Sequence, residues 1–187
     1  MMKRILAIGT AAMLMLAGCS GSSAEGSGAV PTAGYFSEFS AETFDRESVV
    51  TQEQLADYDL NMINIWATFC GPCINEMPDL AELADEYEGQ GLQIIGICSD
   101  VYNGESIDEE LMAAGQEIID TTGADYLHLI PDDAMVTGLL SDVFAVPSTY
   151  FVDSEGNTLK IVVGAKSKED WKTQIDELLS EVRAEEE

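Results

Sequence analysis

Basic residues are scarce in this chain of 187 residues: Lys and Arg number 8, against 35 Asp and Glu, which gives a formal net charge of −27. A surface with so much negative charge repels the phosphate backbone, so we expect no nucleic-acid partner. Four Cys are too few to staple a fold of this length with disulfides. Disorder of the whole chain is also excluded, because hydrophobic residues make up 46% of it. The composition predicts one acidic, globular domain.

The N-terminal residues predict a targeting signal rather than folded structure. Lys3 and Arg4 precede an uncharged apolar run that is too short to span a bilayer comfortably and that ends in Leu16-Ala17-Gly18-Cys19. This pattern resembles the bacterial lipobox, in which cleavage falls before the Cys and its thiol is lipidated. An ordinary signal peptide or a loose membrane helix is the alternative. The resemblance implies a signal peptide over 1–18 and a lipid anchor on Cys19.

A linker separates this signal from the domain. Residues 19–34 contain the lipidated Cys and a stretch of mainly Ser, Gly and Ala, which buries nothing and acts as a flexible tether. We therefore expect the folded domain over 35–187.

Hydrophobic patterning in the domain predicts strands that alternate with helices and end in a hairpin and a last helix. We expect a strand or hairpin within 44–51, strands over 61–67, 92–99, 126–130, 148–152 and 158–163, a helical turn over 52–58, and helices over 72–88, 106–122, 132–144 and after Ser167. This order is typical of an α/β fold in which helices flank a central mixed β-sheet.

The motif Cys70-Gly71-Pro72-Cys73 lies where a predicted buried strand ends and a helix begins. The N-terminus of a helix presents unpaired N–H groups and the positive end of the helix dipole, and both favour a thiolate. Two intervening residues let the sulfurs meet within one turn. The placement therefore indicates redox chemistry, with Cys70 as nucleophile and Cys73 as resolving thiol.

Two other interpretations of these cysteines are a zinc half-site and a purely structural disulfide. Zinc would need further ligands, and the chain offers Cys98, His128 and carboxylates but no second paired motif. We expect Cys98 to be an inert buried thiol, with an auxiliary redox role as the alternative, and we assign His128 no role. No metal site is expected.

The residues around the motif carry a family resemblance. Trp66-Ala67-Thr68-Phe69-Cys70-Gly71-Pro72-Cys73 resembles the thioredoxin active-site sequence W-A-x-W-C-G-P-C, and Val146-Pro147-Ser148-Thr149 resembles the cis-proline loop of that family. The continuation C-x-x-C-x-x-E-x-P resembles the TlpA/ResA branch of membrane-anchored, extracytoplasmic thiol–disulfide oxidoreductases. The resemblance implies a thioredoxin-like fold with an N-terminal strand extension and a helical insertion, for which 106–122 is the candidate.

The resemblance also implies residue roles. Cys70 would attack a client disulfide, Cys73 would resolve the mixed disulfide, and the redox-active Cys70–Cys73 disulfide would replace any cofactor. Pro147 would be cis beside the disulfide, and the Val146 backbone would offer hydrogen bonds to an extended client. The residues expected to bind the client are Trp66, Phe69, Gly71, Pro72, Val146 and Pro147. Of these, Trp66 is expected mainly to pack beneath the active site, with a smaller direct role.

Glu76 follows Cys73 by three positions, so both lie on one face of the helix. A partly buried carboxylate there could take up and return the proton of the resolving thiol, whereas the alternative is an ordinary surface Glu. Asn64 stands where thioredoxin has a buried Asp and cannot relay a proton, so that duty would shift to Glu76 or water. Phe69 replaces a Trp and lacks its indole N–H.

The favoured function is reduction of disulfides in protein or peptide clients on the outer side of a bacterial cell membrane. The Gly-Pro dipeptide resembles thioredoxin, a reductant near about −270 mV. The resemblance implies clients such as apocytochrome c or a methionine sulfoxide reductase, and an integral-membrane thiol carrier resembling CcdA or DsbD as electron donor.

Two other functions are weighed against it. A peroxiredoxin-like thiol peroxidase needs the pattern Pro-x-x-x-Thr/Ser-x-x-Cys, but Ile63 and Ala67 hold those places, and Arg46 and Arg183 are distant in sequence. A metal- or haem-binding lipoprotein without enzyme activity would use the same cysteines.

Overall fold

The computed structural model describes residues 34–185. The expected signal peptide, Cys19 and the linker up to residue 33 lie outside the described residues. The elements in chain order are β1 (Ser40–Glu42), β2 (Val49–Thr51), the 3₁₀ helix η1 (Gln52–Asp57), β3 (Leu60–Trp66), α1 (Gly71–Glu86), β4 (Leu92–Cys98), α2 (Glu109–Thr122), β5 (Leu127–Leu129), α3 (Asp133–Thr137), the 3₁₀ helix η2 (Leu139–Asp142), β6 (Ser148–Asp153), β7 (Thr158–Val163) and α4 (Lys168–Glu185).

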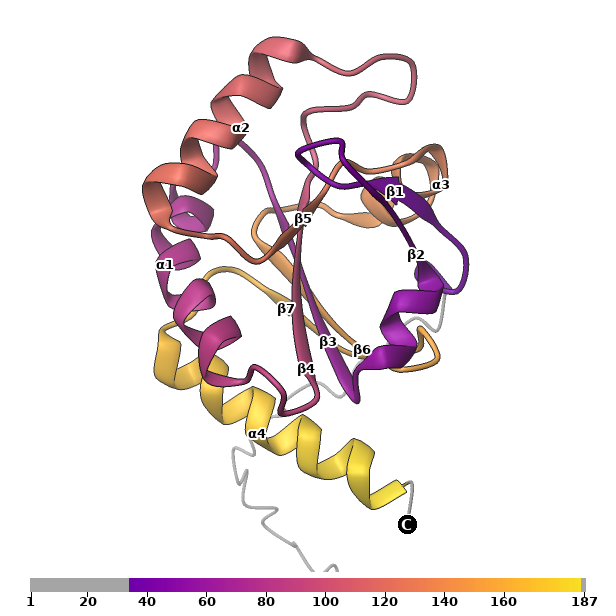
Figure 1. The fold of residues 1–187 in the computed structure, drawn as a ribbon, viewed down its shortest axis with the longest axis vertical. Coiled ribbons are helices and arrows are strands. Elements are labelled where there is room, and N and C mark those ends of the chain that lie inside the picture. The colour runs from indigo at the N-terminus through magenta and orange to yellow at the C-terminus, as the bar shows by residue number, and fades with distance from the viewer. Residues whose placement is uncertain (1–33, 186–187) are drawn as a thin grey trace, which may run out of the picture.

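A five-stranded sheet with the order β5-β4-β3-β6-β7 forms the centre of the domain (Figure 1). Strands β5, β4 and β3 run parallel, whereas β6 pairs antiparallel with both β3 and β7. All seven residues of β3 and of β4 are buried, as the continuous apolar runs predicted. The predicted mixed sheet is therefore confirmed, and β3 lies at its middle.

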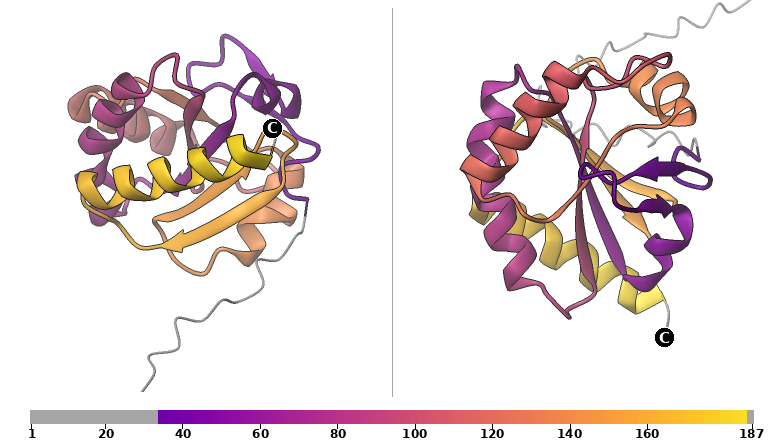
Figure 2. Two further views of the ribbon diagram at one scale, coloured as in Figure 1. Left: turned by 90° about the horizontal axis from the view of Figure 1, so that it is seen from below. Right: turned by 45° about the horizontal axis from the view of Figure 1, so that its top comes forward.

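Two layers cover the sheet, as the views of Figures 1 and 2 show. Helices α1, α2 and α4 lie on one face, and the β1–β2 hairpin, η1, α3 and η2 lie on the other. Successive side chains of β3 point to opposite faces of the sheet. Met62 packs with Leu80 of α1 and Trp171 of α4, whereas Ile63 and Ile65 pack on the opposite face. Each face buries its own apolar core.

The strand or hairpin expected within 44–51 is a hairpin, but its first strand lies before residue 44. Strands β1 and β2 pair as an antiparallel hairpin, and residues 43–48 make its turn, in which Arg46 has a φ of 60°. Phe44 leaves the hairpin to pack against Trp66 and against α2, where a Cβ on Gly115 would come within 2.6 Å of the Phe44 ring. The Phe44 N–H also donates to the His128 carbonyl at 2.8 Å, so this segment covers the β5 edge of the sheet.

The expected helical insertion is α2, which connects the parallel strands β4 and β5. It begins later than predicted, because the Asp108 carboxylate caps it by accepting the N–H groups of Glu110 and Leu111. Gly123 ends it in the left-handed conformation, with a φ of 67°. The single helix expected over 132–144 is instead two short ones, α3 and η2, which Gly138 separates.

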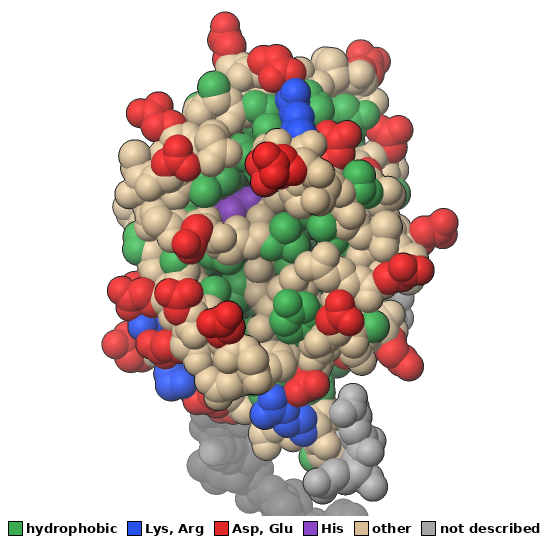
Figure 3. Space-filling view, viewed as in Figure 1, with side chains coloured by type: hydrophobic (Ala, Val, Ile, Leu, Met, Phe, Trp, Pro, Cys, Tyr) green, Lys and Arg blue, Asp and Glu red, His purple; other side chains and the backbone are tan. Residues whose placement is uncertain are grey.

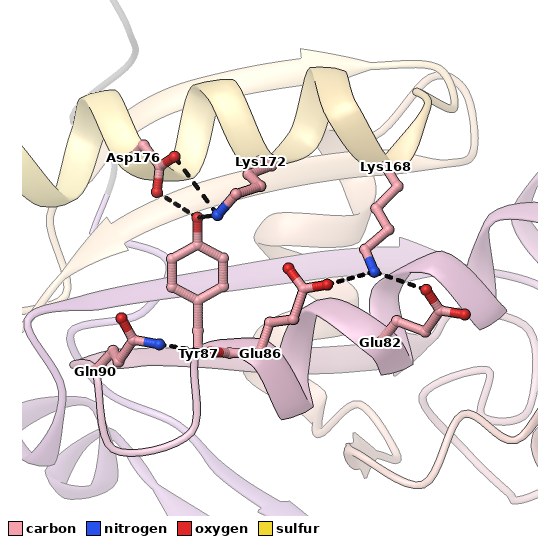
Figure 4. Close-up of polar contacts among 7 residues, drawn as sticks. All are labelled: Glu82, Glu86, Tyr87, Gln90, Lys168, Lys172 and Asp176. Atoms are coloured by element: carbon pink, nitrogen blue, oxygen red, sulfur yellow. Dashed lines mark hydrogen bonds and ion pairs between the residues drawn. The ribbon is translucent and has the colours of Figure 1, made fainter.

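Charged side chains cover the outside of the domain. Figure 3 shows Asp and Glu spread over one whole face with few Lys or Arg among them. Between α1 and α4, Lys168 pairs with Glu82 and Glu86 at 2.6 Å each, and the Tyr87 hydroxyl lies between Lys172 and Asp176 (Figure 4). Within 34–185, no helix is both long and apolar enough to cross a bilayer.

Candidate active site

A disulfide joins Cys70 and Cys73 at the N-terminus of α1. Cys70 is the N-cap residue, and its sulfur accepts the backbone N–H of Cys73 at 3.2 Å. Both side chains are buried, while Gly71 and Pro72 between them are exposed. Because the helix N-terminus directs an N–H group and its dipole at the Cys70 sulfur, this sulfur is the one on which negative charge is stabilised.

Glu76 lies one turn further along α1 and is only 3% exposed. One carboxylate oxygen accepts the Asn64 side-chain N–H at 3.1 Å. The other accepts the Lys166 backbone N–H at 3.2 Å and the Trp171 indole N–H at 3.3 Å. The alternative of an ordinary surface Glu is therefore wrong, since strand β3, helix α4 and the segment before α4 all hold this carboxylate.

Burial raises the pKa of Glu76 above its ordinary value, although the hydrogen bonds from Lys166, Asn64 and Trp171 oppose the shift. Asn64 also donates to the Thr149 hydroxyl at 3.0 Å, and its own side-chain oxygen has no partner among the described residues. A buried carboxylate with a raised pKa takes up a proton more readily than an exposed one. The arrangement thus suits a group that gains and loses a proton.

The Val146–Pro147 peptide bond is cis, as predicted. Val146 is partly buried and packs against the cluster that contains both cysteines. A surface groove of about 580 Å³ opens beside it, with Phe69 and Phe144 exposed by 77% and 95%. The groove is lined by Phe69, Ser99, Asp100, Leu140, Val143, Phe144, Ala145 and Val146.

Trp66 is fully buried and packs with Cys70, Cys73 and Met77. This burial agrees with Trp66 as a packing residue beneath the active site, and it leaves Trp66 no exposed surface for direct contact with a client. Its indole N–H has no partner among residues 34–185.

Cys98 and His128 are both buried. Cys98 is a free thiol, fully buried, and burial together with Asp100 raises its pKa. The His128 ring packs against Trp66 and Tyr126, and its Nε2 lies 3.0 Å from the Ala124 carbonyl oxygen. Burial lowers the pKa of His128 to about 4, so it is neutral at physiological pH.

Sequence reasoning missed the groups that hold Glu76 and the loop before Cys70. Trp171 and Lys166 lie 95 and 90 residues beyond Glu76, so only the folded chain brings them to it. The other missed group is Asp100, whose carboxylate accepts the backbone N–H and the hydroxyl of Thr68. The available signal was an acidic residue two positions after the end of β4, the buried strand next to β3.

A thiol peroxidase would need an arginine beside its thiolate, but Arg46 and Arg183 are both paired with acidic residues. Arg46 pairs with Glu109 at 3.1 Å, and Arg183 pairs with Asp59 at 2.8 Å near the opposite end of α1. In the described part of the chain, no three of the His, Cys, Asp and Glu side chains are grouped so that they could hold a metal ion.

A disulfide at a helix N-terminus, a cis-proline loop beside it and this sheet order define a thiol–disulfide oxidoreductase with a thioredoxin-like fold. Residues 35–160 match the family model described as the AhpC/TSA family, and the chain belongs to this family.

Known proteins agree with this class. Thiol:disulfide interchange protein DsbE of Pseudomonas aeruginosa is 30% identical over 144 residues, which cover 74% of this chain and 73% of that protein. Thiol-disulfide oxidoreductase ResA of Oceanobacillus iheyensis is 29% identical over 133 residues, or 68% of this chain and 62% of that protein. Among solved structures, a thiol:disulfide interchange protein of the thioredoxin family from Chlorobium tepidum has a TM-score of 0.62 at 21% identity, covering 76% of this chain and 93% of that chain, which shows a shared fold.

Proposed function

We propose that the reduced protein transfers two electrons to disulfides of protein or peptide clients and leaves with its own Cys70–Cys73 disulfide. The observation that carries this proposal is the hydrogen bond from the Cys73 N–H to the Cys70 sulfur, which favours the thiolate of Cys70. The names of the relatives DsbE and ResA support the same chemistry.

In the first step the Cys70 thiolate attacks one sulfur of the client disulfide. A Cys70–client disulfide forms, the client S–S bond breaks, and the released client sulfur takes a proton from solvent. The exposed Phe69 and Phe144 and the groove between them provide apolar surface for the client chain, and the Val146 backbone is available to an extended segment.

In the second step Cys73 attacks the Cys70 sulfur. The Cys73 thiol must lose a proton before or during this attack, and we assign that proton to Glu76, directly or through water. The carboxylate is three residues further on the same helix and has a raised pKa, so it can accept the proton and return it later. A Cys70–Cys73 disulfide forms, the Cys70–client bond breaks, and the client's second sulfur leaves as a thiolate that takes a proton from Glu76 or from solvent. The exchange needs no cofactor besides this disulfide.

The protein would work outside the cytoplasmic membrane, attached by lipid on Cys19 through the flexible linker. A membrane-embedded dithiol carrier, of the kind exemplified by CcdA or DsbD, would return the electrons, and apocytochrome c or a methionine sulfoxide reductase are candidate clients. Replacing Cys19 by Ala tests the anchor. The variant should move from the membrane fraction to the soluble fraction, whereas unchanged membrane association contradicts lipid attachment at this residue.

Turnover of insulin disulfides with dithiothreitol as electron donor tests the activity. The wild-type domain should accelerate insulin reduction, and the variant Cys70→Ser should not. Absence of wild-type activity together with one tightly bound zinc per chain would contradict the proposal in favour of a metal-binding lipoprotein. Consumption of hydrogen peroxide at a higher rate than insulin would favour a thiol peroxidase instead.

A further inference from the structure

Asp100 connects the end of β4 to the loop that precedes Cys70. Its two carboxylate oxygens lie 3.2 and 3.1 Å from the Thr68 backbone nitrogen, and the Thr68 hydroxyl donates to one of them at 2.6 Å. The Cys98 thiol donates to the other oxygen at 3.2 Å. One half-buried carboxylate therefore receives two different donors of a single loop residue, a geometry that fixes both the backbone and the side chain of Thr68.

The loop that Asp100 holds is short and directly presents the disulfide. Thr68 is two residues before Cys70, and the Cys70 N–H closes the same turn by donating to the Ala67 carbonyl at 3.0 Å. The neighbouring Ser99 donates its N–H and its hydroxyl to the Trp66 carbonyl at 2.8 and 2.9 Å. Ser99 and Asp100, the first two residues after β4, thus bind the end of β3 and the start of the loop by hydrogen bonds. Phe69, which lies between Thr68 and Cys70, is exposed.

We propose that Asp100 is a positioning residue, which holds Thr68 so that the Cys70 sulfur is presented to a client in an attacking orientation. The inference rests on the proposed role of Cys70 as attacking thiol. Hydrogen bonds to a charged acceptor are stronger than those between neutral groups. Small displacements of a reacting group can lower a rate by up to about 100-fold, so loss of this contact should slow the attack.

Asp100 is also the hydrogen-bond acceptor of the Cys98 thiol. This thiol packs in the same cluster as Cys70 and Cys73, and its S–H donates a hydrogen bond to the Asp100 carboxylate at 3.2 Å. Replacement of Asp100 should therefore remove the hydrogen-bond acceptor of the Cys98 thiol and also the contact with Thr68 that holds the loop before Cys70.

The test measures the second-order rate constant with which the reduced protein attacks a small aromatic disulfide, 5,5′-dithiobis(2-nitrobenzoate), far below the unfolding temperature. Asp100→Ala should lower it by about tenfold. Thr68→Val keeps the shape but removes the hydroxyl donor and should lower it by about threefold, while Thr68→Ser should restore the wild-type rate. Combining Thr68→Val with Asp100→Ala should add no further loss, because both remove the same contact.

A matched Thr–Asp pair serves as control. The Thr43 hydroxyl donates to Asp45 at the same 2.6 Å, but in the turn of the N-terminal hairpin. Thr43→Val should leave the attack rate unchanged while lowering the free energy of unfolding as Thr68→Val does. Folded Asp100→Ala and Thr68→Val proteins with the wild-type rate would overturn the positioning role, as would equal slowing by Thr43→Val. A wild-type protein that does not react at all would instead contradict the proposed function.

Discussion

Helix α1 carries three glutamates that meet opposite surroundings. Glu76 near its start is buried and accepts hydrogen bonds only from neutral donors of Asn64, Lys166 and Trp171. Glu82 and Glu86 near its end are exposed and pair with the ammonium group of Lys168 (Figure 4). Burial raises the pKa of Glu76, whereas the hydrogen bond from Lys168 lowers the pKa of Glu86.

The surroundings of a carboxylate on this helix, and not the residue type, decide whether it is an exposed ionised group or a buried group with a raised pKa. An exposed carboxylate with an ammonium partner stays ionised and adds to the acidic surface. A buried carboxylate without a full counter-charge has a raised pKa, so it takes up a proton more readily than an exposed one, as a proton carrier must. Variants of these glutamates and of their hydrogen-bond partners test this contrast.

Asn64→Asp should have the largest effect, because it places a second carboxyl group about one hydrogen bond from Glu76. Two such groups cannot both ionise, so the pair would keep one proton in the folded state well above pH 5. Between pH 5 and pH 8 the free energy of unfolding should fall by about 3 kcal/mol more than in the wild type. Urea unfolding at both pH values measures this, and parallel curves for the two proteins would contradict it.

Glu76→Gln should slow release of the client roughly 100-fold, since a positioned proton acceptor is lost. The attack by Cys70 should keep its rate, because Glu76 serves Cys73 only. Single-turnover measurements of mixed-disulfide formation and decay separate the two steps. Glu86→Gln is the matched control on the same helix and should change neither. Equal slowing of both steps in Glu76→Gln would contradict the assignment.

Trp171→Phe should shift the acid limb of the pH profile for the release step to higher pH, with a few-fold loss of rate at neutral pH. The indole N–H stabilises the ionised form of Glu76, so its loss raises the pKa of that carboxyl further. Phe keeps most of the apolar packing. A uniformly lower rate with an unshifted profile would indicate a purely structural role for Trp171.

The smallest expected effect is on the pH dependence of stability, which should change in opposite directions in Glu76→Gln and Glu86→Gln. The folded pKa of Glu76 is raised, so its favourable contribution to stability is present below its unfolded pKa and is lost as the pH rises through the folded value. The folded pKa of Glu86 is lowered, so its contribution is present above its unfolded pKa and is lost as the pH falls. Glu76→Gln should therefore gain stability relative to the wild type as the pH rises from 4 to 8, and Glu86→Gln should lose it. The same sign in both urea-unfolding series would contradict the contrast.

Much of the fold was predictable because its signals are local. The apolar runs of β3 and β4 and the Cys70-Gly71-Pro72-Cys73 junction located the central strands and α1 to within one or two residues. The hairpin β1–β2 was not predictable in detail, since its three-residue strands depend on pairing and on packing of Phe44 against Trp66. Gly138 divides the helix expected over 132–144, and the pattern of apolar residues did not show that break.

Some residues of the site were also predictable from local sequence, whereas others were not. The cysteines and Glu76 follow from spacing along one helix, and the cis bond before Pro147 follows from the family resemblance. The donors that hold Glu76 come from β3, from α4 and from the segment before it. Asp100 acts across 32 residues on Thr68. Such contacts are set by sheet order, which the sequence indicates only after the whole topology is known.

The central claim is that Cys70 attacks a client disulfide and Cys73 resolves the adduct. The most direct test incubates the reduced Cys73→Ala variant with insulin and maps the covalent product by mass spectrometry of its peptides. We expect a mixed disulfide on Cys70 that accumulates and that dithiothreitol releases, with Cys98 still a free thiol. An adduct on Cys98, or none while the wild type reduces insulin, would contradict it.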